Sequence, residues 1–142
     1  MHIRPYLEAD EAATIALWHA CELTRPWNDP ARDIARKLTV QREWFLVGTV
    51  DGRVMASAMA GYDGHRGWVN YLAVDPAHRG RGHARALMAE IERLLLAAGC
   101  PKVNLQVRAG NAAAAAFYER LGYARDEVVS YGRRLIPDTP AS

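Results

Sequence analysis

Short apolar runs separated by polar turn residues fill the middle of the chain, and this pattern predicts an antiparallel meander of strands. Two apolar runs flank Asp51-Gly52, a dipeptide that favours a type I′ hairpin turn. A second turn at Asp63-Gly64 carries the chain into a third apolar run. The strands expected from this part of the sequence, with a short edge strand before them, are 2–6, 44–50, 53–62 and 67–74.

The remaining apolar residues recur mostly at helical spacing. The clearest stripe lies between 84 and 98 and ends at Gly99, a residue typical of a helix C-terminus. Asp29-Pro30 supplies an N-cap and a first-turn proline for another helix. The helices expected are 9–23, 30–38, 84–98 and 111–121, with Gly122 closing the last of them and a strand at 102–108 before it.

The order of these elements predicts a mixed α/β fold. The crossover from Val74 to Lys102 passes through a helix, so it should be right-handed and place strands 67–74 and 102–108 in parallel. A final strand pair is expected across 127–136. We predict one domain over 1–137 and a flexible tail at 138–142.

Composition is that of an ordinary soluble domain. The chain has 142 residues, of which half are hydrophobic and 24% are charged, and its net charge of +2 is too small to indicate nucleic acid. No apolar run approaches the roughly 18 residues of a membrane span, and the N-terminus lacks a signal-peptide pattern. We expect a cytoplasmic protein with reduced Cys21 and Cys100 and no metal site.

The stretch 77–88 (AHRGRGHARALM) places Gly80 and Gly82 among arginines at a helix start. Free N–H groups at a helix N-terminus bind anions, and glycine lets phosphate oxygens approach the backbone. The same stretch could be only a tight turn with solvated arginines. A Walker motif is absent, and the GxGxxG pattern fails at its last glycine. The cluster is short and has no interleaved aromatic residues, which argues against nucleic-acid binding.

Two segments together resemble the GCN5-related N-acetyltransferase (GNAT) family. LAVDPAHRGRGHARALM (72–88) is similar to its acyl-CoA signature, [QR]xxGx[GA], with Ala77 in the first position. NAAAAAFYERLGY (111–123) is similar to the family's Asn-x-x-Ala…Tyr-x-x-x-Gly-[FY] segment. The stretches RPWNDP, GYDGHRG and GRRLI further resemble the bacterial YpeA-type branch. The resemblance implies an acyl-CoA N-acyltransferase fold, in which the strands on either side of the crossover splay apart.

The resemblance also implies a cofactor, acetyl-CoA, and residues that hold it. The pantetheine arm would lie along the backbone of one splayed strand, and the pyrophosphate would lie on the glycine turn. Asn111 would contact the arm, although it is also a natural N-cap, and Tyr118 would protonate the leaving thiolate, although it could be a core tyrosine. The cofactor-binding set is Leu72, Ala73, Val74, Arg79, Gly80, Arg81, Gly82, His83, Ala84, Asn111, Ala114 and Tyr118, and the Leu72 N–H would stabilise the oxyanion.

The general base is left open, because neither splayed strand carries a carboxylate. The candidates are His65, Asp63, Tyr71, Glu127 or a relayed water. Arg25, Trp27 and Asn28 would face the acceptor, although RPWNDP could equally be a stiff connection between helices.

The predicted reaction is direct attack of a primary amine on the thioester in a ternary complex. The predicted partners are therefore acetyl-CoA and an amine-bearing acceptor, with no nucleic acid or membrane. A homodimer is an open option, with Trp44 or Trp68 at its surface. The alternatives are a non-catalytic acyl-CoA sensor and an acyltransferase that uses another acyl-CoA.

Overall fold

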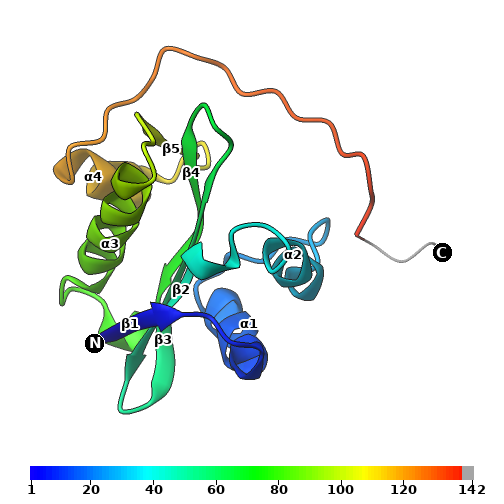
Figure 1. Ribbon diagram of the computed structural model, residues 1–142, viewed down its shortest axis with the longest axis vertical. Helices are drawn as coiled ribbons and strands as arrows, with labels where there is room; N and C mark the ends of the chain where they lie inside the picture. Colours follow the sequence, from blue (N-terminus) through cyan, green and yellow to red (C-terminus); the bar gives the residue numbers. More distant parts are fainter. Residues whose placement is uncertain (139–142) are drawn as a thin grey trace.

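A five-stranded sheet forms the centre of the computed structural model, which describes residues 1–138 (Figure 1). Its order is β1-β2-β3-β4-β5, and every neighbouring pair is antiparallel except β4 and β5, which are parallel. The predicted meander and the predicted parallel pair are therefore confirmed. The strands are β1 His2–Pro5, β2 Phe45–Val50, β3 Arg53–Tyr62, β4 Gly67–Val74 and β5 Val103–Leu105.

Four α-helices pack on this sheet, and their starts follow the local sequence. The Asp29 side chain caps its helix as predicted, since its Oδ1 accepts a hydrogen bond from the Ala31 N–H at 2.9 Å. The first helix is shorter than expected, because Glu22 adopts a left-handed backbone conformation (φ +58°) just beyond it. The helices are α1 Glu11–Ala20, α2 Pro30–Lys37, α3 His83–Ala97 and α4 Ala112–Arg120.

The sheet is buried on both faces, with α3 and α4 on one side and α1 and α2 on the other (Figure 1). Strand β2 shows this directly. Leu46 belongs to the core cluster under α3, whereas its neighbours Phe45 and Val47 belong to the cluster under α1 and α2. Side chains alternate between the faces of a strand, so a strand buried on both faces reads as a nearly continuous apolar run.

Strands β4 and β5 pair only at one end. The ladder runs from Gly67 opposite Val103 to Val69 opposite Leu105, and β4 then continues alone to Val74. The predicted strand 102–108 is accordingly cut to three residues. From Asn70 onward, the edge of β4 on the β5 side has no strand partner among residues 1–138.

A β-bulge interrupts β4 in the same stretch. The register with β3 shifts between Ser57 and Met59, opposite Tyr71 and Leu72. Tyr71 adopts a left-handed backbone conformation (φ +53°), which costs free energy for a large side chain. Its ring stacks on Trp18 at a centroid distance of 3.8 Å, and this packing holds the unusual conformation in place.

The strand pair expected across 127–136 is wrong. Residues 124–138, here called the C-terminal strap, form neither helix nor strand and run from α4 across to α2 (Figure 1). Side chains fasten the strap at both ends: Lys102 to Asp126 at 2.8 Å near β5, and Arg36 to Asp138 at 2.6 Å on α2. Gln106, directly after β5, also donates from Nε2 to Ser130 Oγ at 2.6 Å, and contacts spread in this way along the strap draw it out instead of folding it into a hairpin. Its large apolar side chains are consequently exposed, namely Val128, Val129, Tyr131, Leu135 and Ile136.

Asp138 begins the predicted tail but is itself buried, so the ordered structure continues through this residue. Its carboxylate accepts hydrogen bonds from the Arg36 guanidinium at 2.6 Å and from the Asp29 N–H at 2.9 Å. These bonds lower the pKa of Asp138 to about 2, the contact with Arg36 having the largest effect. The rest of the predicted tail, 139–142, lies outside the described residues.

Asp138→Asn is expected to release the strap from α2. Because the folded pKa of Asp138 lies below its ordinary value of 3.8, the stabilisation is present above about pH 4 and is lost as the pH falls towards 2. Limited proteolysis within 124–137 should become several-fold faster in the variant at neutral pH and, with pepsin, in the wild type as the pH falls towards 2. An unchanged cleavage rate in the variant would show that the strap does not depend on this carboxylate.

Neither Cys21 nor Cys100 forms a disulfide. Within residues 1–138 no cluster of three His, Cys, Asp or Glu side chains could hold a metal ion. In the same part of the chain no helix combines the length and the apolar character needed to cross a bilayer.

Candidate active site

The glycine turn leaves its backbone open to solvent. Gly80 and Gly82 both have positive φ, at +77° and +80°, and a Cβ on either would meet no atom within 4 Å. No backbone N–H from Arg79 to Arg85 donates a hydrogen bond to another backbone group within residues 1–138. The first such bond beyond the turn is from Ala86 to the Gly82 carbonyl, at 3.0 Å. These free N–H groups, at the positive end of the 15-residue α3, form a ready anion site.

The structure also corrects how the sequence pattern is placed on this turn. Ala77 belongs to a short 3-10 helix whose N-terminus is capped by the Asp75 side chain, so it lies before the turn. The pattern [QR]xxGx[GA] fits every position from Arg79 to Ala84, and the apparent departure at Ala77 disappears. The turn, with Gly80 and Gly82 in the left-handed conformation, coincides with the pattern in this register.

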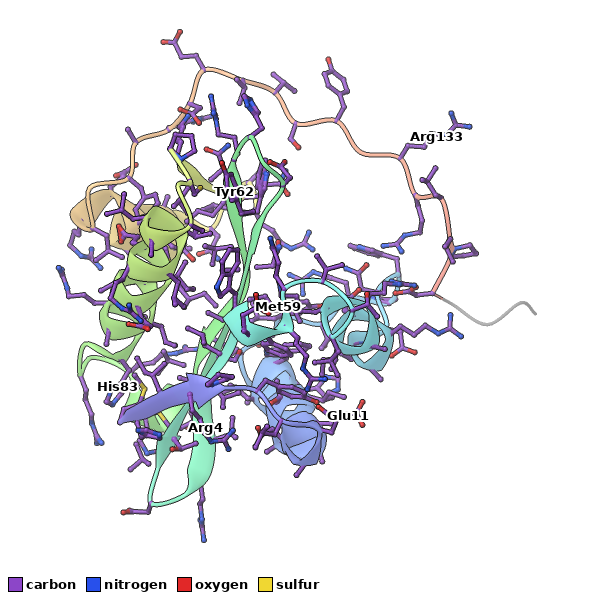
Figure 2. The ribbon with its side chains drawn as sticks, viewed as in Figure 1. Arg4, Glu11, Met59, Tyr62, His83 and Arg133 are labelled. Atoms are coloured by element: carbon purple, nitrogen blue, oxygen red, sulfur yellow. The ribbon has the colours of Figure 1, made fainter. Side chains whose placement is uncertain are left out.

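The charge around the turn is positive. Arg81 and Arg85 form no ion pair within the described residues, and the first turn of α3 carries no acidic residue. Burial, the N-terminal ammonium group, His78 and Arg81 all lower the pKa of His83, whose side chain stands at the start of α3 (Figure 2). A bound anion would relieve the unfavourable interaction of these cations with one another.

The neighbouring strand brings three predicted residues to the turn. Leu72 is half-buried, and Ala73 and Val74 are buried on β4, at the edge that lacks a strand partner. The Val74 carbonyl already accepts bonds from Arg79 Nε at 3.2 Å and Cys21 Sγ at 3.3 Å. This carbonyl therefore already has hydrogen-bond partners within the protein, and the bond from Arg79 links the turn to the strand.

Asn111 is an N-cap. Its Oδ1 accepts a hydrogen bond from the Ala114 N–H at 3.1 Å and so satisfies one of the free donors at the start of α4. The side-chain amide NH₂ makes no hydrogen bond within the described residues. The capping role and a second contact through the NH₂ group are thus compatible.

Tyr118 projects from α4 onto the core cluster under α3, against which Leu72 and Ala84 also pack. The strand, the first turn of α3 and the phenol thus pack on the same core cluster. Tyr118 contacts Phe117 and Tyr123 edge-on, at centroid distances of 5.1 and 5.9 Å. Burial raises the pKa of Tyr118, so its hydroxyl stays protonated at neutral pH.

The candidate bases lie in different places. Asp63 Oδ1 accepts bonds from the His65 and Arg66 N–H groups, both at 2.7 Å, and these bonds lower the pKa of Asp63. Glu127 is exposed on the strap. The Tyr71 hydroxyl donates to Asp33 Oδ2 at 2.6 Å, and burial followed by Asp33 raises the pKa of Tyr71. Asp63 is held as a carboxylate and the Tyr71 hydroxyl is already bonded to Asp33, so neither is a ready proton acceptor by itself.

The predicted acceptor residues lie between α1 and α2. Arg25 and Asn28 line a cavity of about 560 Å³ together with Asp138 of the strap. Trp27 is 49% exposed, and the Arg108 guanidinium lies 5.8 Å from its ring centroid. Arg108 follows β5, so this contact joins the two sides of the fold across the splayed strands.

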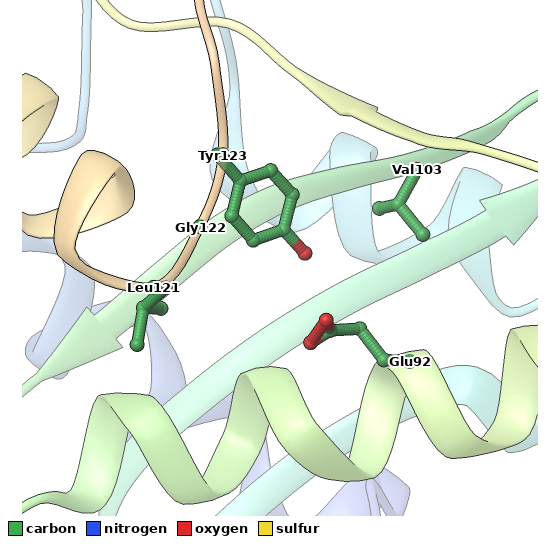
Figure 3. A pocket seen from close by; sticks show the side chains of 5 residues that line it. All are labelled: Glu92, Val103, Leu121, Gly122 and Tyr123. Carbon is green, nitrogen blue, oxygen red and sulfur yellow. The ribbon is translucent and has the colours of Figure 1, made fainter.

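A second cavity, of about 200 Å³, shares no lining residue with the first and lies between α3 and the end of α4 (Figure 3). The Tyr123 hydroxyl points into it, is buried and has no hydrogen-bond partner in the described part of the chain. Burial, Glu92 and Tyr118 raise the pKa of Tyr123 to about 12. The cavity thus presents a neutral phenol and no positive charge among its lining residues.

Sequence reasoning missed several polar residues around the α1–α2 connection, chiefly Asp33, Arg108 and Asp138. Asp33 and Asp138 share the Arg36 guanidinium, and Asp33 also binds Tyr71. Contacts between positions about 40 and 100 residues apart leave no periodic signal, so no pattern in one sequence could have revealed them.

Known proteins match this chain along most of its length. The model of the acetyltransferase (GNAT) family matches residues 12–123. An acetyltransferase of Yersinia enterocolitica is 49% identical over 138 residues, covering 97% of this chain and 98% of the relative.

Two solved structures share the fold. The aminoglycoside 6′-N-acetyltransferase AAC(6′)-Ig of Acinetobacter haemolyticus has a TM-score of 0.76 at 22% identity, covering 96% of this chain and 99% of that one. AAC(6′)-Iy, solved with a bisubstrate analogue that contains CoA, has a TM-score of 0.73 at 18% identity, covering 94% and 97%. The family model over residues 12–123 and the 49% identical relative establish that the chain belongs to the acetyltransferase (GNAT) family.

Proposed function

We propose that the protein transfers the acetyl group of acetyl-CoA to a primary amine, by direct attack within a ternary complex. The diphosphate of the cofactor is held by the backbone N–H groups from Arg79 to Ala84, with Arg81 supplying positive charge. The pantetheine arm lies along the free edge of β4 at Leu72–Val74 and reaches Asn111 and Ala114. This assignment is supported by the open turn and by the edge of β4 that no strand covers.

The chemistry follows from the groups around the thioester. Attack of a neutral amine on the carbonyl carbon places negative charge on the carbonyl oxygen, which the Leu72 N–H stabilises. The nitrogen of the intermediate releases one proton to solvent water. Collapse of the intermediate breaks the C–S bond, Tyr118 donates its proton to the leaving thiolate, and the Tyr118 phenolate is reprotonated from solvent. The raised pKa of Tyr118 keeps this proton available at neutral pH.

The observation that carries the proposal is the run of free N–H groups at the start of α3, next to a strand edge with no partner. Acetyl-CoA at about 100 times its Kd should stabilise the fold by about 2.7 kcal/mol, or about 8 °C in Tm. Release of free thiol in the presence of primary amines would then measure transfer. No shift in Tm with acetyl-CoA, or no thiol release with any primary amine, would exclude the proposed reaction.

The acceptor is proposed to enter beside Arg25, Trp27 and Asn28. Trp27 is half-exposed and held by Arg108, so it offers an apolar wall at the mouth of the site. Trp27→Ala is expected to raise the KM for the acceptor about tenfold, because truncation of an exposed aromatic contact removes about 1–2 kcal/mol of binding. The KM for acetyl-CoA and the Tm should stay within twofold and 2 °C, respectively. An unchanged acceptor preference would place the acceptor elsewhere.

A further inference from the structure

The connection between α1 and α2 holds the guanidinium of Arg25 in place. Its Nη1 donates hydrogen bonds to the backbone carbonyls of Glu22 at 2.8 Å and Thr24 at 2.9 Å. A guanidinium has five N–H donors, and those at Nε and Nη2 of Arg25 make no hydrogen bond within residues 1–138. The two bonds to the backbone therefore position a cation whose Nε–Nη2 edge is free.

Arg25 lines the cavity of about 560 Å³ beside α2, and His19 at the end of α1 lines it as well. Trp18, which precedes His19, stacks on Tyr71 of β4 at a centroid distance of 3.8 Å. Tyr71 in turn precedes Leu72, whose N–H is proposed to hold the oxyanion. The cavity therefore adjoins the part of α1 that packs on β4 next to the proposed reaction centre.

Two carboxylates also line this cavity, and each already has an arginine beside it. Asp138 lies 2.6 Å from Arg36. Asp29 caps α2 through Oδ1, and its Oδ2 lies 3.7 Å from Arg32. Arg25, in contrast, forms no ion pair among residues 1–138. It is the arginine of this cavity whose charge lacks a counter-ion in the described part of the chain.

A second arginine without an ion pair lies at the predicted acceptor wall. The Arg108 guanidinium is 5.8 Å from the Trp27 ring centroid, and its side chain forms no ion pair within residues 1–138. Trp27 follows Arg25 by two positions. The wall at Trp27 is thus accompanied by two cations, which attract an anionic group and repel a polycation.

We propose that the acceptor carries a carboxylate as well as its primary amine, and that Arg25 binds this carboxylate through Nε and Nη2. A guanidinium edge matches the two oxygens of a carboxylate and forms a bidentate, charge-assisted pair with it. A single negative charge suits the cavity better than a phosphate dianion, because Asp29 and Asp138 line the same cavity and repel a second negative charge. The inference rests on the proposed function and names its substrate class, in which the carboxylate is either a C-terminus or an acidic side chain.

Two pairs of short acceptors test this inference, and the members of each pair share the same kind of α-amine but differ in one carboxylate. Alanyl-glycine and its amide differ at the C-terminus, whereas alanyl-aspartyl amide and alanyl-asparaginyl amide differ in the side chain. In at least one pair the acid should have a kcat/KM about 10- to 100-fold above that of its neutral partner, mostly through KM. The pair that shows this preference identifies the source of the carboxylate. Equal values within both pairs would overturn the inference.

Substitutions of Arg25 show whether this residue causes the preference. Arg25→Gln should abolish it by lowering kcat/KM for the acid, while the value for the neutral partner stays within about twofold. Arg25→Lys should keep part of the preference, because lysine retains the charge but loses the fork. Acetyl-CoA should shift the Tm of both variants as much as that of the wild type. A preference that survives in Arg25→Gln would overturn the inference.

Arg53→Gln is the matched control. Arg53 is exposed at the start of β3 and forms no ion pair among residues 1–138, so its loss should leave the full preference for the acid. If the wild type acetylates other primary amines but none of these four acceptors, the inference falls and the proposed function stands. Absence of transfer to every primary amine would overturn the proposed function, and this inference with it.

Discussion

Tyr118→Phe is expected to lower kcat about 100- to 1,000-fold while the Kd for acetyl-CoA changes less than threefold. The phenol provides the proton for the leaving thiolate, and a placed general acid typically contributes factors of 10² to 10⁴. Phenylalanine keeps the edge-on contacts with Phe117 and Tyr123, so packing on α4 should be preserved. Steady-state thiol release would give kcat, and a thermal shift or calorimetric titration would give the Kd.

Two further observations would support the role of Tyr118 as the general acid. The loss of kcat in Tyr118→Phe should be similar for strongly and weakly basic amines, because Tyr118 acts on the leaving group and not on the acceptor. It should shrink with an acetyl thioester whose thiol is more acidic and leaves more easily. Turnover equal to that of the wild type would remove Tyr118 from the reaction and leave it as a core tyrosine.

Gly82→Val is expected to weaken acetyl-CoA binding at least tenfold. The position has φ +80°, and a β-branched residue there costs about 1–2 kcal/mol. If the turn relaxes to avoid this cost, the N–H groups from Arg79 to Ala84 no longer point at one anion. A change of 1.4 kcal/mol corresponds to a factor of ten in Kd.

Gly52→Val is the matched control for this substitution. Gly52 has φ +75° in the turn between β2 and β3, and a Cβ there also meets nothing within 4 Å. Both variants should therefore lose similar stability, which thermal unfolding measures, but only Gly82→Val should bind acetyl-CoA poorly. Equal Kd values for the two variants would mean that the glycine turn does not hold the diphosphate.

Asp138 connects the strap to the cavity beside α2. It lines the 560 Å³ cavity and also binds Arg36, which contacts Asp33.

Much of the fold is local and could be read from the chain. Asp51-Gly52 forms the β2–β3 turn, Asp29 caps α2, and Asn111 caps α4, because each depends on residues within a few positions. The glycine turn is also local, since positive φ at Gly80 and Gly82 and the start of α3 follow one another directly. The family resemblance rested on these local patterns, and the family match confirmed it.

The features that the sequence did not predict correctly also have physical reasons. The segment 127–136 has the β-branched and aromatic residues of a strand, but a strand needs a partner edge. Side-chain contacts at Asp126, Ser130 and Asp138 draw this segment out across the protein without pairing its backbone. The Asp33–Tyr71 pair joins α2 to β4 across 38 positions, and Arg108 meets Trp27 across a still longer interval. The sequence by itself determined most of the elements, the glycine turn and the family, because these depend on neighbouring residues. Only the tertiary structure decided which charges face each other around the α1–α2 connection, because packing of separate elements brings them within reach.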